Sequence, residues 1–281
     1  MNVKITSDST CDLSPELIEK YDISITPLTV HCGECSGSDG LGITPEDIYE
    51  YVAKSGKLPK TSAVNVYDYV QEFRRWRDAG MTVVHFCISA DFSACFQNAN
   101  LAADEVGGVL VVDSRNLSSG QGLLVLRAAE MAAAGSSAEE IWQECTELTG
   151  RVEASFVVDS LDYLYKGGRC SALSAFGGNL LRLKPCIEVR GGKMVPGKKY
   201  RGKIEHVMLQ YVAERVSARG DIDWTRAFIT HTRCAPEAVA AVRAKLEELG
   251  HFEEILDTTA GATVTSHCGP NTLGVLFIRS K

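Results

Sequence analysis

The chain has 281 residues, 45% of them hydrophobic and 23% charged, which is enough to bury the core of one large domain or of two ordinary ones. Its net charge of −7 leaves no basic excess to neutralise phosphates, which argues against nucleic acids and anionic membrane surfaces as partners. No apolar run approaches the roughly 20 residues that a membrane-spanning helix needs. Residues 1–8 open directly on a strand-like alternation without a leader, so we expect a cytoplasmic protein.

Short buried strands alternate with helices in the first half of the chain. Apolar runs predict strands at residues 3–6, 25–30, 81–88 and 109–112. Helix starts are indicated by Ser14 and Thr44, each followed by proline, and by Asn65 with an acidic residue three positions later. Residues 123–134 and 138–148 read as two further helices. This alternation predicts a Rossmann-like parallel sheet with helices on both faces.

The second half of the chain has a different order of elements. Strands are expected at residues 156–159, 186–189, 227–230, 254–257 and 274–278, and long helices at 204–218 and 236–249. Two helices among several strands predict an α+β layered domain. We place the boundary near Gly150, which gives an N-terminal α/β domain (1–150) and a C-terminal α+β domain (151–281). The basic run 193–203 predicts a solvated face.

The ten cysteines have no paired spacing, so they predict buried small side chains in a reducing compartment. The exception is Cys32-Gly-Glu-Cys35, which follows His31. Such a pair is half of a metal or redox site, but no second pair supplies the other half. A tight turn is the favoured interpretation, and we expect neither a metal nor a cofactor.

Residues 161–166 begin as a short amphipathic helix, which Gly167 and Gly168 end directly before Arg169. One interpretation is a helix end capped by glycine, with the positive charge of Arg169 stabilising the negative end of the helix dipole. The other is that the two glycines supply backbone angles that aim Arg169 at a specific site.

Hydroxyl side chains recur at the presumed carboxyl ends of the strands, where ligands bind in open α/β sheets. The loops that carry them are 7–10, 61–62, 89–93 and 113–122. Hydroxyls beside a helix start are suited to hold a carboxylate or a phosphate. No histidine stands beside a serine there, so the pattern indicates binding of an acid rather than bond cleavage. Each hydroxyl can instead be an ordinary helix cap, and this alternative is strongest for Ser93 and Ser118.

Taken together, these segments resemble the DegV family of bacterial lipid-binding proteins. The resemblance is carried by residues 7–13, 61–62, 88–99, 112–122, 161–169, 183–185 and 267–274. It implies a two-domain α/β protein that buries a long-chain fatty acid, such as palmitate, between its domains. It also implies that the protein is not an enzyme and presents the acid to a separate fatty acid kinase.

The resemblance assigns roles to individual residues. Thr61, Ser93 and His267 would bind the fatty-acid carboxylate. Residues that would support these or contact the partner protein are Ser62, Ser119, Arg169 and Arg201. The chain departs from the family pattern at Asp91, whose charge must point away from a bound carboxylate unless the ligand differs. Phe92 and Phe96 would shape the acyl tunnel.

Two other functions remain open from the residues alone. The first is an acyl hydrolase or transferase with Ser93 or Cys95 as nucleophile and His267 or His85 as base. It lacks the Gly-x-Ser-x-Gly turn that exposes such a nucleophile. The second is a phosphate- or nucleotide-binding regulator, for which neither of the usual glycine-rich loops is present after a strand.

Overall fold

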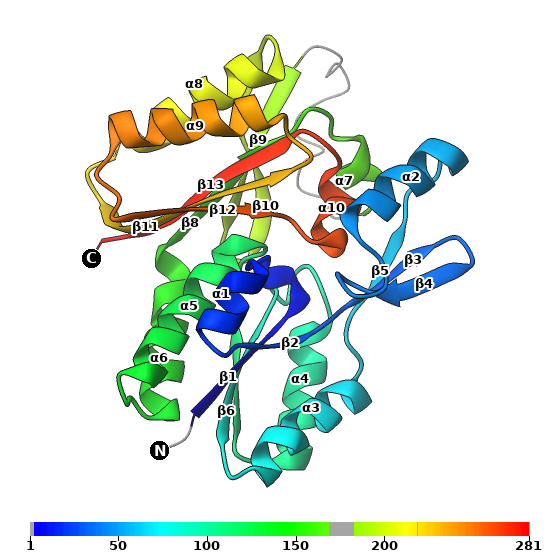
Figure 1. Cartoon of the computed structure of the whole chain (residues 1–281), viewed down its shortest axis with the longest axis vertical. Helices are drawn as coiled ribbons and strands as arrows, with labels where there is room; N and C mark the ends of the chain where they lie inside the picture. Colours follow the sequence, from blue (N-terminus) through cyan, green and yellow to red (C-terminus); the bar gives the residue numbers. More distant parts are fainter. Residues whose placement is uncertain (1–2, 169–182, 218, 281) are drawn as a thin grey trace.

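The computed structural model describes residues 3–168, 183–217 and 219–280. Its first layer is a four-stranded, fully parallel sheet in the order β2-β1-β6-β7. The strands are β1 (Val3–Asp8), β2 (Ser24–Thr26), β6 (Thr82–Cys87) and β7 (Val109–Asp113). Helices α3 (Val66–Asp78) and α4 (Cys95–Val106) lie on one side of it, and α5 (Ser119–Ala133) and α6 (Ala138–Leu148) on the other (Figure 1). The predicted Rossmann-like sheet is confirmed.

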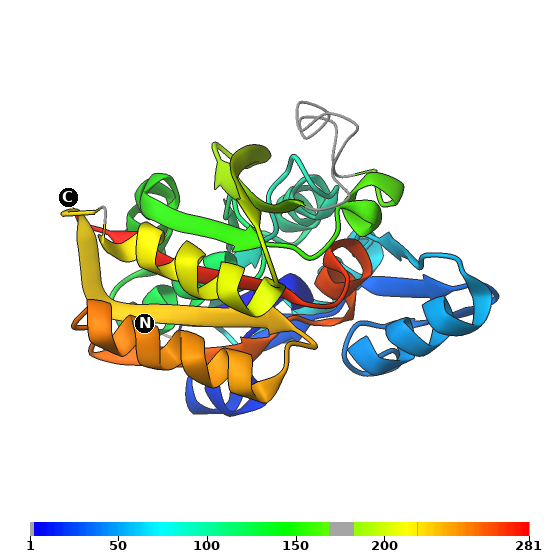
Figure 2. The same ribbon diagram turned by 90° about the horizontal axis from the view of Figure 1, so that it is seen from above.

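A second sheet of six strands, in the order β10-β9-β8-β13-β11-β12, is antiparallel except for the β11–β12 pair. Its strands are β8 (Val152–Val157), β9 (Leu183–Arg190), β10 (Lys193–Arg201), β11 (Ile222–Thr232), β12 (Glu254–Thr259) and β13 (Thr272–Arg279). Helices α8 (Ile204–Ser217) and α9 (Pro236–Leu249) cover one face (Figure 2). The other face packs on α5 and shares the hydrophobic core of the parallel sheet. This is the predicted α+β layer. The boundary at Gly150 falls in the short helix η2 (Thr149–Arg151) and stays a prediction.

A small third sheet was not predicted. Strands β3 (Thr29–Cys32), β4 (Cys35–Ser38) and β5 (Lys60–Ser62) pair in the order β4-β3-β5 beside α2 (Pro45–Ser55). The single strand expected at 25–30 is wrong, because Pro27 ends β2 and the chain turns into β3. Figure 1 shows this sheet at the side of the molecule, next to α7 (Asp162–Lys166) and α10 (Ala262–Cys268).

Several helices start where their capping residues predict. Ser14 caps α1 (Pro15–Lys20), Thr44 caps α2 and Asn65 caps α3, each through a side-chain oxygen that accepts a backbone N–H. The basic run 193–203 is solvated as expected, since its lysines and Arg201 are exposed, and most of it forms β10 at the edge of the second sheet. Lysines are common on edge strands, where their charge discourages pairing with another chain.

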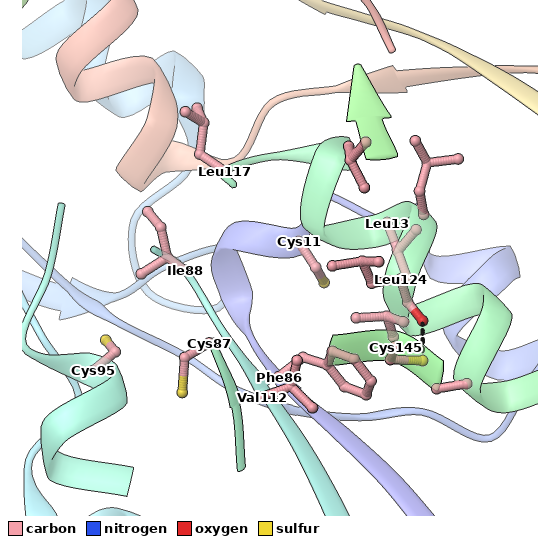
Figure 3. Close-up of a cluster of buried hydrophobic side chains, with 14 of the residues drawn as sticks. Cys11, Leu13, Phe86, Cys87, Ile88, Cys95, Val112, Leu117, Leu124 and Cys145 are labelled. Atoms are coloured by element: carbon pink, nitrogen blue, oxygen red, sulfur yellow. Dashed lines mark hydrogen bonds between the residues drawn. The ribbon is translucent and has the colours of Figure 1, made fainter. Parts of the chain in front are cut away.

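The cysteines behave as small apolar side chains. Six of the nine in the described residues are buried, and Figure 3 shows several of them inside the main hydrophobic cluster. Cys32 and Cys35 are cross-strand partners at the β3–β4 turn, where Gly33 has a φ of 69°. Within the described ranges, no group of three or more metal-ligating side chains is present, and no helix is long and apolar enough to cross a membrane.

Candidate functional site

One pocket lies at the carboxyl ends of the parallel strands, between the two large sheets. Thr61, Ser93 and His267 all line it, although they come from β5, the loop before α4 and α10. Most of its other walls are apolar: Leu28, Ala63, Ile88, Phe92, Leu117, Met194, Val264 and Cys268. No lysine or arginine is among the described residues that line it. The pocket therefore combines a few neutral hydrogen-bonding groups with apolar walls.

Thr61 and His267 form the polar centre of this pocket. Thr61 Oγ1 lies 2.8 Å from His267 Nε2, a contact between residues 206 positions apart. Because side chains alternate along a strand, Ser62 faces away from Thr61. Its hydroxyl lies 2.9 Å from His31 Nε2, and Ser62 does not line the pocket.

Ser93 stands just before α4. The helix begins at Cys95 with Ala94 at the N-cap, so the interpretation of Ser93 as an ordinary N-cap is wrong. Its Oγ accepts the Cys95 N–H at 3.3 Å and lies 3.2 Å from Cys95 Sγ. Burial raises the pKa of the Cys95 thiol to about 11, which keeps it protonated at neutral pH and disfavours it as a nucleophile.

His85, the other base considered for a hydrolase, is in the core. It is fully buried, bonds Thr6 Oγ1 at 2.8 Å and stacks edge-on against Tyr69 and Phe73. Burial lowers the pKa of His85 to about 3, so the ring stays neutral. It does not line the pocket that contains Ser93.

Gly167 packs directly against the ring of His267. A Cβ atom added to Gly167 would lie 2.5 Å from His267 Nδ1, so close approach requires glycine here. Its φ of −76° needs no glycine, whereas Gly168 has a φ of 72° and does. The expectation of special backbone angles therefore holds for Gly168 alone. Arg169 lies outside the described residues.

Two acidic side chains accept hydrogen bonds from the other end of α10. The Gly261 N–H donates to Asp12 Oδ1 at 2.8 Å, and the Ala262 N–H donates to Asp39 Oδ1 at 2.7 Å. The Ser118 hydroxyl also donates to Asp12, so Ser118 does not cap α5 through its side chain. Burial above all, and then the nearby charge of Asp39, raises the pKa of Asp12 to about 8. Residues of the N-terminal half of the chain thus hold the helix that carries His267.

A second, more apolar cavity adjoins the first. The two share Leu117, Val264 and Cys268 as walls, and Figure 3 shows Leu117 and Ile88 at one end of the main hydrophobic cluster. Further walls of the second cavity come from the inner face of the six-stranded sheet: Ala154, Phe156, Val189, Gly274 and Leu276. A polar chamber therefore lies next to an apolar slot between the sheets.

The other expected residues lie outside the polar chamber. Ser119 is fully buried and bonds Thr230, beside the apolar cavity. Arg201 is exposed at the end of β10. Asp91 points away from the chamber, as a bound carboxylate would require, and lies 3.5 Å from Lys193 Nζ. Phe92 lines the chamber, whereas Phe96 packs against the core.

Thr263 was missed by the sequence analysis. It lines the same chamber as Thr61, is 4% exposed, and its hydroxyl has no hydrogen-bond partner among the described residues. A buried hydroxyl without a partner is costly, which marks a place for a polar group of a ligand. No sequence pattern points to Thr263, because it belongs to a short helix that only the fold brings to the chamber.

Comparisons with known proteins agree with this architecture. Residues 2–280 match a family model described as "Uncharacterised protein, DegV family". A DegV domain-containing protein of Deinococcus radiodurans is 35% identical over 278 residues, which cover 98% of each chain. The chain also resembles a solved Thermus thermophilus structure, described as fatty acid binding of a DegV family protein, with a TM-score of 0.89 and 32% identity over 99% of this chain and 100% of that one.

A second solved structure comes from Eubacterium ventriosum and is described as a stearic acid-binding protein. Its TM-score is 0.84 at 29% identity, and the match covers 99% of this chain and 98% of that one. Because the family model spans nearly every residue and a relative above 30% identity is matched over almost its whole length, the chain belongs to the DegV family.

Proposed function

We propose that this protein binds a long-chain fatty acid, with the carboxylate in the polar chamber and the acyl chain in the adjoining apolar cavity. The observation that carries the proposal is that the two spaces are adjacent and share Leu117, Val264 and Cys268 as lining residues. Burial of an acyl chain contributes about 0.8 kcal/mol per CH2, so the apolar cavity supplies affinity and the polar chamber supplies orientation. The similar Eubacterium ventriosum protein, described as binding stearic acid, supports this class of ligand.

The carboxylate would be held by neutral donors. If His267 Nε2–H donates to Thr61 Oγ1, the Thr61 hydroxyl hydrogen is left to donate to the ligand. Ser93 and the unpartnered hydroxyl of Thr263 line the same space and would donate as well. Hydrogen bonds to a charged acceptor contribute about 1.5–3 kcal/mol each.

Presentation of the acid to a separate kinase is part of the same proposal. Thr61, Ser93 and His267 are each only partly buried, whereas Phe156 and Val189 at the acyl end are buried. A second protein would therefore reach the carboxylate more readily than the tail. Ser62, Arg169 and Arg201 are the residues that we propose for that contact.

A titration tests the proposal. Chain stripped of lipid is heated with increasing palmitate or with its methyl ester, and Tm is recorded. We expect palmitate to raise Tm, because a ligand that binds only the folded state stabilises it, and the ester to raise it less, because it has no carboxylate. The absence of stabilisation by any long-chain acid would contradict the proposal.

Gly167 offers a further prediction. Gly167→Ala places a methyl group 2.5 Å from His267 Nδ1 and 2.9 Å from the Tyr163 carbonyl, so the ring must shift from its position beside Thr61. We expect the affinity for palmitate to fall by about tenfold, the equivalent of one hydrogen bond. Gly168→Ala is the matched control, since a Cβ there has no atom within 4 Å and introduces only backbone strain. Equal affinities of the two variants in a calorimetric titration would refute the role given to Gly167.

A further inference from the structure

A second cleft, separate from the fatty-acid site, is lined by arginines. Its volume is about 540 Å3, and four of its twelve lining residues are arginines against one glutamate. These are Arg115 after β7, Arg190 at the end of β9, Arg219 after α8 and Arg279 at the end of β13. We call this space the arginine cleft. It shares no lining residue with the polar chamber.

The arginine cleft is positively charged, whereas the whole chain carries a net charge of −7. Three carboxylates pair with its arginines, and each is shared by two or three guanidinium groups. Glu153 contacts Arg215, Arg219 and Arg279, Glu188 contacts Arg190 and Arg215, and Asp221 contacts Arg219 and Arg279. Five guanidinium groups, Arg115 included, thus face three carboxylates, and the excess positive charge lies in a concave site.

The backbone holds two of the guanidinium groups in place. Arg115 Nη2 donates to the Gly191 carbonyl at 2.8 Å, and Arg279 Nη2 donates to the Gly150 carbonyl at 2.6 Å. The Arg115 bond is the one hydrogen bond that its guanidinium makes within the described residues. A guanidinium has five N–H donors, so most of those of Arg115 are available to a ligand. Such preorganised forks match the oxygens of a phosphate group.

We propose that the arginine cleft binds a phosphate-bearing small molecule without an aromatic base. The excess of guanidinium groups selects a multivalent anion, and the volume suits a ligand larger than a bare phosphate ion. None of the described lining residues is aromatic, so nothing there would stack on a nucleobase. The Thr149 hydroxyl, which donates to the Thr146 carbonyl at 2.8 Å, keeps an acceptor for a hydroxyl of a sugar or polyol. This inference does not depend on the fatty acid function.

The test is a calorimetric titration of the full chain with pyrophosphate and with ribose 5-phosphate, at constant ionic strength. We expect saturable binding that weakens by roughly tenfold to a hundredfold in the Arg115→Gln/Arg190→Gln double variant, which loses two charged donors. Both side chains are exposed, so the variant should keep its fold, checked by Tm. Arg190→Lys keeps the positive charge but loses the planar guanidinium. Its affinity for the probes should lie between that of the unchanged chain and that of the double variant.

Arg243→Gln is the matched control, because this ion-paired arginine lies on α9 outside the cleft. It should bind both probes like the unchanged chain. Absence of saturable binding by the unchanged chain, or equal affinities in the control and the double variant, would overturn the proposal. Tighter binding of ATP than of both probes would overturn the exclusion of an aromatic base. Fatty acid content is expected to be the same in all variants.

Discussion

Replacement of both Thr61 and Ser93 by alanine is expected to lower the affinity for palmitate by about a hundredfold to ten-thousandfold. Two hydrogen bonds to a charged carboxylate are lost, and each contributes about 1.5–3 kcal/mol. The apolar cavity does not change, so the variant should still bind the acyl chain weakly. Isothermal titration of lipid-free protein with palmitate measures the change.

The neighbouring residue provides the control for this double variant. Ser62→Ala removes a hydroxyl from the same strand but on the opposite face, where it bonds His31. It should leave palmitate affinity unchanged. The double variant loses one hydrogen bond to a helix backbone, the one that Ser93 Oγ accepts from the Cys95 N–H at 3.3 Å. The far-ultraviolet circular dichroism spectrum should therefore be retained. Palmitate affinities within threefold of each other for the double variant and Ser62→Ala would refute the site assignment.

The second large effect concerns pH and Asp12. The pKa of this carboxyl is raised to about 8 from an ordinary 3.8, chiefly by burial. Between these values the folded chain keeps a proton that the unfolded chain has released. The stabilisation from this proton is therefore full below pH 4 and is lost as pH rises to about 8, at most ~1.4 kcal/mol per pH unit. Asp12→Asn removes the titration while keeping an oxygen for the Gly261 N–H.

The measurement is Tm across pH 5 to 9 for the unchanged chain and for Asp12→Asn. The difference in Tm, unchanged chain minus variant, should fall steadily as pH rises and level off above about pH 8. Asp104→Asn, at an exposed site, is the control. The Tm of the unchanged chain minus the Tm of this variant should stay constant with pH. A constant difference for Asp12→Asn would contradict the raised pKa.

Much of the fold could be predicted from local patterns. Apolar runs located β1, β6 and β7, and hydroxyl or amide caps located the starts of α1, α2 and α3. The third sheet could not be predicted, because β4 and β5 are short, polar and stable only against β3 and α2. The strand at 152–157 was expected four residues too late, since Glu153 and Ser155 interrupt its apolar pattern.

The site was only partly predictable for a related reason. Hydroxyls at strand ends indicated an acid-binding crevice, but the assignment of Thr61, Ser93 and His267 to one place came from family resemblance. No spacing rule joins Thr61 to His267 across 206 positions. The role of Gly167 against His267 and that of Asp12 at the start of α10 are tertiary contacts, invisible to periodicity. The arginine cleft likewise collects side chains from four separate elements.

The most direct test of the central claim is extraction of the purified full chain with organic solvent, followed by mass spectrometry of the extract. The account predicts a long-chain fatty acid in stoichiometric amount from the unchanged chain and from Ser62→Ala, and little from the Thr61→Ala/Ser93→Ala variant. An extract without fatty acid, from a chain that added palmitate also fails to stabilise, would contradict it.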